Sequence, residues 1–189
     1  MNSRSPGPAR WKKTADTKLV RTRVFDLHRT RFHHPARAVA RDFVVIHPPD
    51  WVNILALTPD HQLVLVKQFR FGIEKFSLEI PGGMMEAGEK PAATALRELR
   101  EETGFVGKRA RLLGSVHPNP AIQSNRCHFV FVEEAVATAA MEWDEDEEIA
   151  ITTRPVDEVL ALARTGWITH GLVRDALFYF EPLWRRMKP

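Results

Sequence analysis

The run RELREE contains the residues that could do chemistry, because it places Glu98, Glu101 and Glu102 close together. Positions three and four apart are surface neighbours on a helix, so these carboxylates repel by roughly 0.2–0.5 kcal/mol per pair. A cation can offset this repulsion, since hard divalent ions are held by a few carboxylates together with water and substrate phosphates. The alternative is a solvated helix face that Arg97 and Arg100 neutralise.

The segment from Pro91 to Thr103 is predicted to be the helix that carries these glutamates. Pro91 suits the first helical turn, and Gly104 stands where a C-terminal cap favours a left-handed residue. Four apolar residues at positions i, i+3, i+4 and i+7 form a stripe that is expected to face the core: Ala92, Ala95, Leu96 and Leu99. At about 100° per residue, the three glutamates fall together on one flank of that stripe. We therefore expect a single carboxylate patch.

Two successive glycines, Gly82 and Gly83, lie in the stretch EIPGGM just before this helix. Glycine has no Cβ, so the backbone at these positions can approach a ligand closely. A backbone carbonyl from this loop could join the carboxylates. This context favours the metal site over the solvated helix face.

The composition is that of an ordinary globular protein. The chain has 189 residues, of which 44% are hydrophobic and 27% charged, so we expect one packed domain, alone or with a small appendage. Its single cysteine, Cys127, cannot form an internal disulfide, which favours a reducing cytoplasm. No apolar run is long enough to span a bilayer, and the N-terminus lacks the apolar core of a signal peptide. We therefore expect a cytoplasmic protein with no membrane partner.

Part of the net charge of +3 comes from the N-terminus, where residues 1–13 hold four cations and no acid. Glycine and proline there disfavour a helix, so residues 1–14 are expected to form a flexible basic tail. A targeting peptide and a nucleic-acid arm are alternatives, but the tail shows neither amphipathic periodicity nor a recognised binding motif. No nucleic-acid partner is expected.

The rest of the chain alternates β-like runs with turn signals. Runs rich in Val, Ile, Leu and Phe predict strands near residues 23–32, 41–47, 51–58, 62–70, 75–80, 111–116 and 127–135. Two further helices are predicted, at about residues 155–164 and 169–186. Strands that dominate the first half, with interspersed helices, indicate an α/β fold in which helices cover a mixed sheet.

Nine positions between Gly83 and Phe105 resemble the sequence box of the Nudix hydrolase superfamily. They are Gly83, Glu89, Arg97, Glu98, Leu99, Glu101, Glu102, Gly104 and Phe105. Both the residue types and their spacing match, so the signal is highly specific. The resemblance implies a Nudix α/β/α sandwich over residues 51–189, preceded by a small antiparallel strand region at residues 15–50.

The same resemblance implies Mg²⁺-dependent hydrolysis of a nucleoside diphosphate linked to another group, with Mn²⁺ as the alternative ion. Glu98 and Glu102 match the metal ligands of the box, with Glu101 nearby and the Gly82 carbonyl as a further ligand. Glu101 and Arg97 are assigned to the catalytic set. Arg97 is expected to orient the site by pairing with Glu89 and to point away from the direction shared by Glu98 and Glu102. Three positions of the motif have structural roles: Gly83, Glu89 and Gly104.

Residues outside the box resemble the ADP-ribose and nucleoside-diphosphate-sugar pyrophosphatase branch of the superfamily. The features are EIPGG preceded by KQFRFG, a strand region before WVNILAL, and Pro120, sixteen residues beyond Gly104. They imply a nucleotide-sugar substrate that is split into a nucleoside monophosphate and a sugar phosphate. Two alternatives stay open, namely removal of oxidised nucleoside triphosphates and a sensor that binds ADP-ribose without hydrolysing it.

Members of this branch place a further catalytic glutamate in a loop after the box, and here the acidic run is WDEDEEIAI. Matching the family pattern to this run selects Glu147, with Glu145 and Glu148 as the next candidates. A general base must reach the attacking water within hydrogen-bond distance, which the sequence does not show. A solvated acidic loop is the alternative interpretation.

Four residues are assigned to substrate binding. Arg70 matches a substrate-binding arginine of the branch and suits a bidentate phosphate contact, and Glu79 opens the neighbouring EIPGG motif. Arg126 is a second cationic candidate. Trp51 could stack on the base, although packing at the start of a strand is the alternative. Relatives in this branch are dimers whose N-terminal strands reach the partner, so the resemblance also implies a homodimer.

Three histidines, His117, His128 and His170, lack the spacing of metal ligands. Ordinary polar or core roles are therefore expected for them.

Overall fold

The structure is a computed structural model that describes residues 7–142 and 148–188. It divides into two compact units, each of which is described by itself. They are Met1–Pro49 with Asn119–Asn125, and Asp50–Pro118 with Arg126–Pro189. The sequence predicted a boundary near residue 50, but it did not indicate that a short segment far along the chain belongs with the N-terminal unit.

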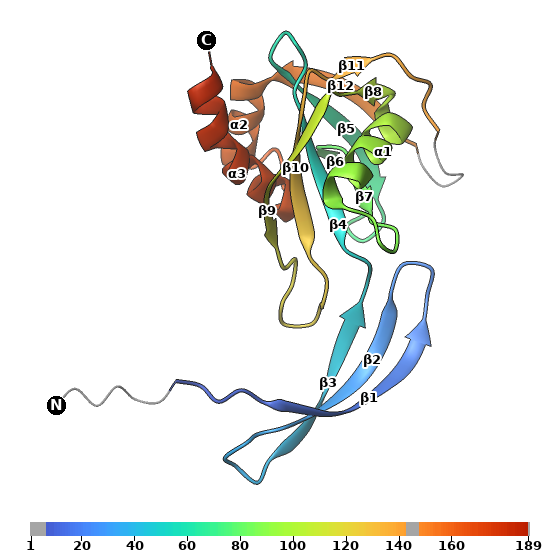
Figure 1. The fold of residues 1–189 in the computed structure, drawn as a ribbon, viewed down its shortest axis with the longest axis vertical. Coiled ribbons are helices and arrows are strands. Elements are labelled where there is room, and N and C mark those ends of the chain that lie inside the picture. The colour runs from blue at the N-terminus through green and yellow to red at the C-terminus, as the bar shows by residue number, and fades with distance from the viewer. Residues whose placement is uncertain (1–6, 143–147, 189) are drawn as a thin grey trace, which may run out of the picture. The chain divides into compact units, whose positions relative to one another are not determined.

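The N-terminal unit is built on a three-stranded antiparallel sheet in the order β1 (Lys12–Arg21), β2 (Asp26–His33) and β3 (Ala40–His47) (Figure 1). Strand β1 begins inside the stretch that was expected to be a flexible tail, so that expectation is corrected from Lys12 onward. Every residue of β1 is exposed. The strand therefore lacks the alternation of buried and exposed residues by which a strand is predicted from sequence.

The larger unit contains a mixed sheet in the order β7 (Gly82–Met84), β4 (Trp51–Ala56), β10 (Cys127–Glu133) and β9 (Arg109–Val116). Strands β4 and β10 are parallel, and the other two pairs are antiparallel. Both faces of β4 and β10 are buried, which explains why their sequences are almost continuously apolar. This confirms the predicted mixed sheet.

A second sheet of the same unit runs in the order β12 (Ala150–Pro155), β5 (Gln62–Arg70) and β6 (Lys75–Glu79) and is antiparallel throughout. A two-stranded sheet pairs β8 (Phe105–Val106) with β11 (Val136–Ala137). The short strands β7, β8 and β11 have too few residues to show a period, so the sequence did not predict them.

In the larger unit, three helices of the described residues pack on its sheets: α1 (Pro91–Thr103), α2 (Val156–Arg164) and α3 (Gly171–Met187). The bounds of α1 are those predicted from its two end residues. Gly104 adopts φ 69° and donates its N–H to the Arg100 carbonyl, as a left-handed cap does. Within residues 7–142 and 148–188, none of the helices is both long enough and apolar enough to cross a membrane.

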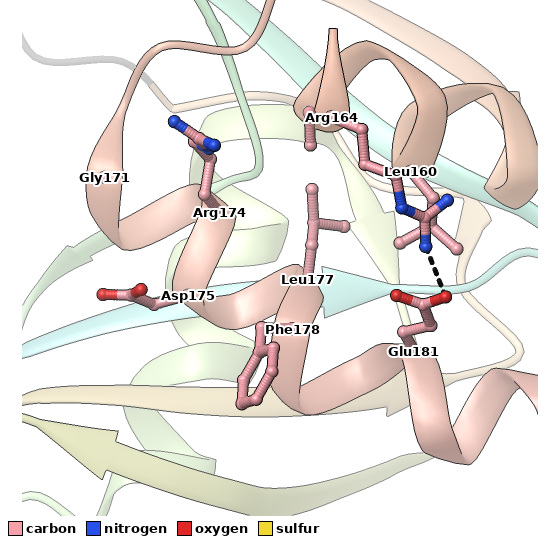
Figure 2. A pocket seen from close by; sticks show the side chains of 9 residues that line it. Leu160, Arg164, Gly171, Arg174, Asp175, Leu177, Phe178 and Glu181 are labelled. Carbon is pink, nitrogen blue, oxygen red and sulfur yellow. Dashed lines mark hydrogen bonds and ion pairs between the residues drawn. The ribbon is translucent and has the colours of Figure 1, made fainter. Parts of the chain in front are cut away.

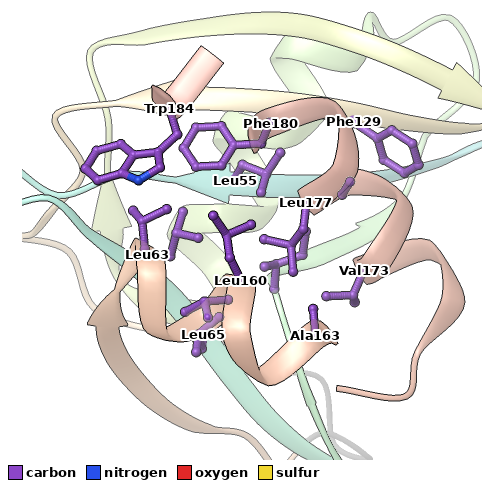
Figure 3. Packing of buried hydrophobic residues seen from close by; sticks show 14 of the residues in the cluster. Leu55, Leu63, Leu65, Phe129, Leu160, Ala163, Val173, Leu177, Phe180 and Trp184 are labelled. Atoms are coloured by element: carbon purple, nitrogen blue, oxygen red, sulfur yellow. The ribbon is translucent and has the colours of Figure 1, made fainter. Parts of the chain in front are cut away.

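Alternate side chains of the central strands pack against different helices. Val52 and Ile54 of β4 belong to the cluster that contains Ala95 and Leu99 of α1. Leu55, the next residue along the strand, belongs to the cluster on the opposite face, which packs against α2 and α3 (Figure 3). In Figure 1, α1 and the α2 and α3 pair accordingly lie on opposite sides of the strands. The larger unit is therefore the predicted α/β/α sandwich.

The buried face of α1 differs from the predicted apolar stripe. Ala95 and Leu99 are buried as expected, but Leu96 is 36% exposed. Thr94 and Glu102 are buried in addition. Relative to the predicted orientation, α1 is rotated about its axis, so that the Glu102 side chain, rather than Leu96, faces the interior. This rotation brings the Glu102 carboxylate next to strand β7, which contains Gly82 and Gly83.

Candidate metal and substrate site

The carboxylates of α1 lie against strand β7. Glu102 is only 5% exposed, and its Oε2 accepts a hydrogen bond from the Gly82 N–H at 3.0 Å. The side chains of Glu98 and Glu101 are 15% and 27% exposed, respectively. A buried glutamate is not part of a solvated helix face, so the structure favours the metal-site interpretation of this helix.

Close approach between β7 and its neighbours requires both glycines. A Cβ at Gly83 would lie 2.2 Å from Cδ of Glu98. A Cβ at Gly82 would lie 2.3 Å from the Val52 backbone oxygen. Real Cβ atoms do not come so close to other heavy atoms. The two glycines thus let the β7 backbone meet the Glu98 carboxylate and strand β4 at contact distance.

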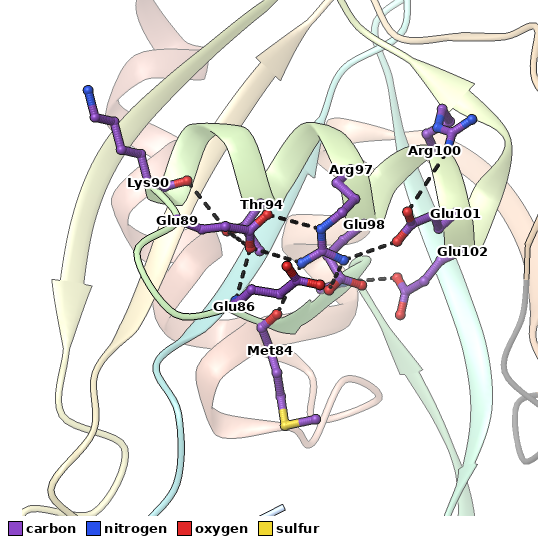
Figure 4. Close-up of polar contacts among 11 residues, drawn as sticks. Met84, Glu86, Glu89, Lys90, Thr94, Arg97, Glu98, Arg100, Glu101 and Glu102 are labelled. Carbon is purple, nitrogen blue, oxygen red and sulfur yellow. Dashed lines mark hydrogen bonds and ion pairs between the residues drawn. The ribbon is translucent and has the colours of Figure 1, made fainter.

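Arg97 connects Glu89, Glu98 and Glu101 (Figure 4). Its Nη1 donates to Glu98 Oε1 at 2.9 Å and to Glu101 Oε2 at 3.0 Å. Its Nε and Nη2 donate to Glu89 at 3.1 and 3.0 Å, so the expected Arg97–Glu89 pair is present. The expectation that Arg97 points away from Glu98 is wrong. The Cα–Cβ direction does diverge, but the long side chain returns the guanidinium to the carboxylates.

Glu89 is held from several sides. Its Oε2 also accepts hydrogen bonds from the Thr94 hydroxyl at 2.8 Å and from the Glu86 N–H at 3.0 Å. Hydrogen bonds from Arg97, with those from Glu86 and Thr94, lower the pKa of Glu89 from its ordinary value of 4.5 to about 2. The hydrogen bonds to Glu89, with the charge of Glu98 and the hydrogen bonds to Glu101 and Glu98, raise the pKa of Arg97. The pair is therefore fully ionised at neutral pH and fixes the guanidinium in place.

We predict that Glu89 contributes to stability in a pH-dependent way. Because its pKa is lower in the folded protein, the stabilisation is fully present above pH 4.5 and is lost as the pH falls toward 2. Glu89→Gln should lower the free energy of unfolding by roughly 1–2 kcal/mol at pH 7 and by much less at pH 3. Urea unfolding at both pH values measures this difference. Glu86→Gln, which neutralises an exposed neighbour, is the control, and a difference that does not change with pH would contradict the prediction.

The donor set fits a hard divalent cation. Glu98, Glu101 and Glu102 offer only oxygen atoms, which suits Mg²⁺ better than a softer metal. Arg97 also binds Glu89, and Arg100 reaches Glu101 only at 3.9 Å. These two cations are therefore outnumbered by the carboxylates around them. An ion bound here would supply the missing positive charge.

A cavity of about 300 Å³ opens beside the two glycines. Its lining residues come from four separate parts of the larger unit: Trp51, Val52, Asn53, Arg70, Glu79, Ile80, Gly82, Gly83, Met84, His170 and Leu172. Three of the four residues assigned to substrate binding, namely Trp51, Arg70 and Glu79, are among them. Because Gly82 and Gly83 also contact the glutamates of α1, the cavity borders the carboxylate cluster.

Arg70 and Glu79 form a bidentate ion pair at the wall of this cavity. Arg70 Nε and Nη2 donate to the two Glu79 oxygens at 2.8 and 2.6 Å. Glu79 is 2% exposed, whereas the Arg70 side chain is 44% exposed. Burial alone would raise the pKa of Glu79, but the hydrogen bonds and charge of Arg70 outweigh it, so the pKa is lowered. The buried carboxylate thus holds an accessible cation in a fixed orientation.

Sequence reasoning missed His170 as a residue of the site. It lines this cavity and also an adjoining one of about 710 Å³, as do Trp51, Arg70 and Leu172. The Nε2 of His170 lies 3.9 Å from Glu79 Oε2. No local signal could have found it, because His170 precedes α3 and is about 90 residues from Glu79 along the chain.

One assigned residue, Arg126, is not brought into the cavity. Arg126 is exposed and is not among the lining residues, although its carbonyl accepts the Trp51 N–H at 2.9 Å. Glu147 lies outside the described residues, as does Glu145. Glu148 is described and is exposed.

Another cavity, of about 400 Å³, lies between α2 and α3 (Figure 2). Its walls include Leu160, Leu177 and Phe178. Glu181 in this cavity is paired with Arg164, and neither glycine of β7 nor any carboxylate of α1 reaches it. The nearby carboxylates of α1 therefore favour the cavity beside β7 as the candidate functional site.

The chain is similar to known proteins over most of its length. A family model described as the NUDIX domain matches residues 47–175. The ADP-ribose pyrophosphatase of Bacillus subtilis is 30% identical over 171 residues, covering 90% of this chain and 92% of that protein. The methanol dehydrogenase activator of Bacillus methanolicus is 35% identical over 139 residues, covering 72% of this chain and 75% of its own. The crystal structure of an ADP compounds hydrolase superposes with a TM-score of 0.85 at 21% identity and covers 97% of this chain and 99% of that one.

Proposed function

Because this chain belongs to the Nudix hydrolase family, we propose that it hydrolyses the diphosphate linkage of ADP-ribose or a related nucleoside diphosphate sugar. Water would attack one phosphorus, releasing a nucleoside monophosphate and a sugar phosphate without a covalent enzyme intermediate. The observation that carries the proposal is the cavity shared by Gly82, Gly83 and Arg70, which places a carboxylate cluster beside a fixed cation. The similarity to an ADP-ribose pyrophosphatase over most of both chains supports the substrate class.

Glu98, Glu101 and Glu102 would hold Mg²⁺, or Mn²⁺ in its place, and we propose the Gly82 carbonyl as a further ligand. Such an ion, when bound, polarises phosphoryl oxygens and lowers the pKa of a bound water. The Gly82 N–H orients the Glu102 carboxylate, and Arg97 orients Glu98 and Glu101. These fixed hydrogen bonds reduce the reorganisation that the site needs before reaction.

Arg70 and Trp51 would bind the two ends of the substrate. The exposed guanidinium of Arg70, oriented by Glu79, suits the negative charge of a diphosphate. Trp51 faces both adjoining cavities and offers an aromatic surface to a nucleobase. The larger cavity also contains Ile73 and Leu172, so its wall combines apolar and polar groups as ligand pockets do.

Two further proposals rest on the family resemblance, and a third rests on cysteine usage. Glu147 remains our candidate for the general base that accepts a proton from the attacking water. We propose a homodimer in which residues 15–50 contribute to the partner's pocket. A cytoplasmic location is proposed from the single cysteine, Cys127.

The substrate is tested by offering ADP-ribose, ADP-glucose, GDP-mannose and a deoxynucleoside triphosphate in parallel to the purified protein with Mg²⁺. We expect rapid release of a nucleoside monophosphate from one of the diphosphate sugars, and omission of the metal should abolish it. Faster turnover of the triphosphate would instead support a sanitising pyrophosphatase. Tight binding of ADP-ribose without any product would support a non-hydrolytic sensor.

A further inference from the structure

Each strand of the N-terminal sheet contributes one potential metal ligand to the same face. Asp16 of β1 lies opposite Thr30 of β2, and His47 of β3 lies opposite Asp26 of β2. His28 is two residues from both Thr30 and Asp26, so all these side chains point to one face of the sheet. One ligand atom from each of Asp16, His28 and His47 lies within 4.8 Å of the other two.

The two imidazoles present nitrogen atoms that are not satisfied by hydrogen bonds. Nδ1 of His28 and Nε2 of His47 are buried, and neither makes a hydrogen bond of good geometry, although Nδ1 of His28 lies within ion-pair distance of Asp16. The His28 Nδ1 lies 3.2 Å from Asp16 Oδ1, and the two rings are 4.5 Å apart between centroids. Buried polar atoms in proteins are almost always satisfied, so two in one cluster indicate a missing partner.

Surrounding residues orient the donors as an outer shell does in metal sites. The Thr30 hydroxyl donates to Asp16 Oδ1 at 2.7 Å, and Lys13 binds the other Asp16 oxygen at 2.7 Å. Both contacts donate to the carboxylate of Asp16 and hold it in place. Its Oδ1 still has a lone pair for a further partner, since each carboxylate oxygen accepts about two.

His47 is oriented in the same manner. Its Nδ1 lies 2.7 Å from the Ser124 Oγ, and that hydroxyl lies 3.5 Å from the Ile46 carbonyl. When Nδ1–H donates to Ser124 and the hydroxyl donates to Ile46, the lone pair of His47 is on Nε2, the buried atom of the cluster.

We propose that Asp16, His28 and His47 form a binding site for one divalent transition-metal ion of the Zn²⁺ class. Two imidazoles and one carboxylate suit such an ion, whereas Mg²⁺ prefers oxygen alone. Tetrahedral Zn²⁺ with bonds near 2.0–2.1 Å needs ligand atoms roughly 3.3 Å apart. The three ligand atoms already lie within 4.8 Å of one another, so only small side-chain movements are needed to bind the ion. Water completes the coordination.

The bound ion joins all three strands of a sheet that has little core of its own. Among the strand residues of β1, β2 and β3, only Thr30 is buried. An ion that binds the folded sheet and not the unfolded chain stabilises the fold by mass action. The site is therefore structural, and its chemistry differs from the oxygen-only donor set of α1.

The experiment is a calorimetric titration of the full-length, chelator-treated protein with Zn²⁺ in a buffer that contains excess Mg²⁺ to occupy the carboxylates of α1. We expect His28→Gln and His47→Gln each to weaken Zn²⁺ binding at least tenfold and to remove the Zn²⁺-dependent rise in melting temperature. The matched control is His33→Gln, an exposed histidine of the same strand as His28, which should bind as wild type does. Zn²⁺ titrations that are the same in all four proteins, or no Zn²⁺ binding to wild type, would overturn the proposal.

A measurement on the unsubstituted protein covers the case in which a variant does not fold. Imidazole ¹H–¹⁵N correlation spectra should show the His28 and His47 rings shifting on addition of one equivalent of Zn²⁺, while His33 stays unchanged. Zn²⁺ binding without any shift of these two rings would place the ion elsewhere and would refute the site.

Discussion

Glu102→Gln should reduce hydrolysis at saturating Mg²⁺ by about a hundredfold or more while leaving the fold intact. Glutamine has nearly the same size, and its side-chain oxygen can still accept the Gly82 N–H that Glu102 accepts at 3.0 Å. What is lost is one negative charge and one ligand oxygen. Metal-ion stabilisation is worth several kcal/mol, and each 1.36 kcal/mol changes the rate tenfold. Initial rates with the preferred diphosphate sugar, measured over a range of Mg²⁺ concentrations, test this.

The matched control is Glu86→Gln, which removes a carboxylate from the exposed loop before the same helix. Its rate should stay within about twofold of wild type. Circular dichroism and melting temperature establish that Glu102→Gln is folded. Near-normal turnover of a folded Glu102→Gln protein at saturating Mg²⁺ would refute the assignment of Glu102 as a metal ligand.

Gly83→Ala should lower turnover by about tenfold to a hundredfold with little loss of stability. The new Cβ would meet Glu98 at 2.2 Å from Cδ and at 2.3 and 2.4 Å from the two carboxylate oxygens. These atoms are the far end of a flexible side chain, so Glu98 can move aside at small cost. The carboxylate then leaves its position, and a misplacement of about 1 Å in a catalytic group can cost 10²-fold in rate. Turnover and urea unfolding are measured on the same preparation.

Gly82→Ala provides the contrast. Its Cβ would meet the Val52 backbone oxygen at 2.3 Å, and a strand backbone cannot move aside as a side chain can. We expect a loss of stability of roughly 1–3 kcal/mol, as for other overpacked sites. If Gly83→Ala lost as much stability as Gly82→Ala and kept its activity, the close contact with Glu98 would not be what requires a glycine at position 83.

Features that depend on neighbours in sequence could be predicted. Pro91 and Gly104 are sufficient to place both ends of α1, because helix initiation and capping depend on residues within one turn. The long strands β4, β5 and β10 were predicted for a similar reason, since the buried part of each strand is a nearly continuous apolar run. The carboxylate patch followed from helical geometry alone.

Features that depend on packing could not be predicted. The choice between Leu96 and Glu102 as the buried side chain of α1 was decided by strand β7, whose N–H at Gly82 satisfies the glutamate. The direction of the Arg97 guanidinium was decided by side-chain torsions and by Glu89 as its partner. The helical periodicity of the sequence predicts neither of these two results, because it fixes only the direction of each Cα–Cβ bond and not the path of the side chain beyond it.

The residues from Gly82 to Phe105 were enough to predict the type of chemistry, because one helix and the segment before it carry the whole proposed metal-binding set and local spacing positions it. The tertiary structure alone decided the pocket. It brings Trp51, Arg70 and His170 together around one cavity, although more than a hundred residues separate the first from the last. The physical reason is that local spacing positions side chains within one element. Contacts between elements arise only when the strands pair and the helices cover them.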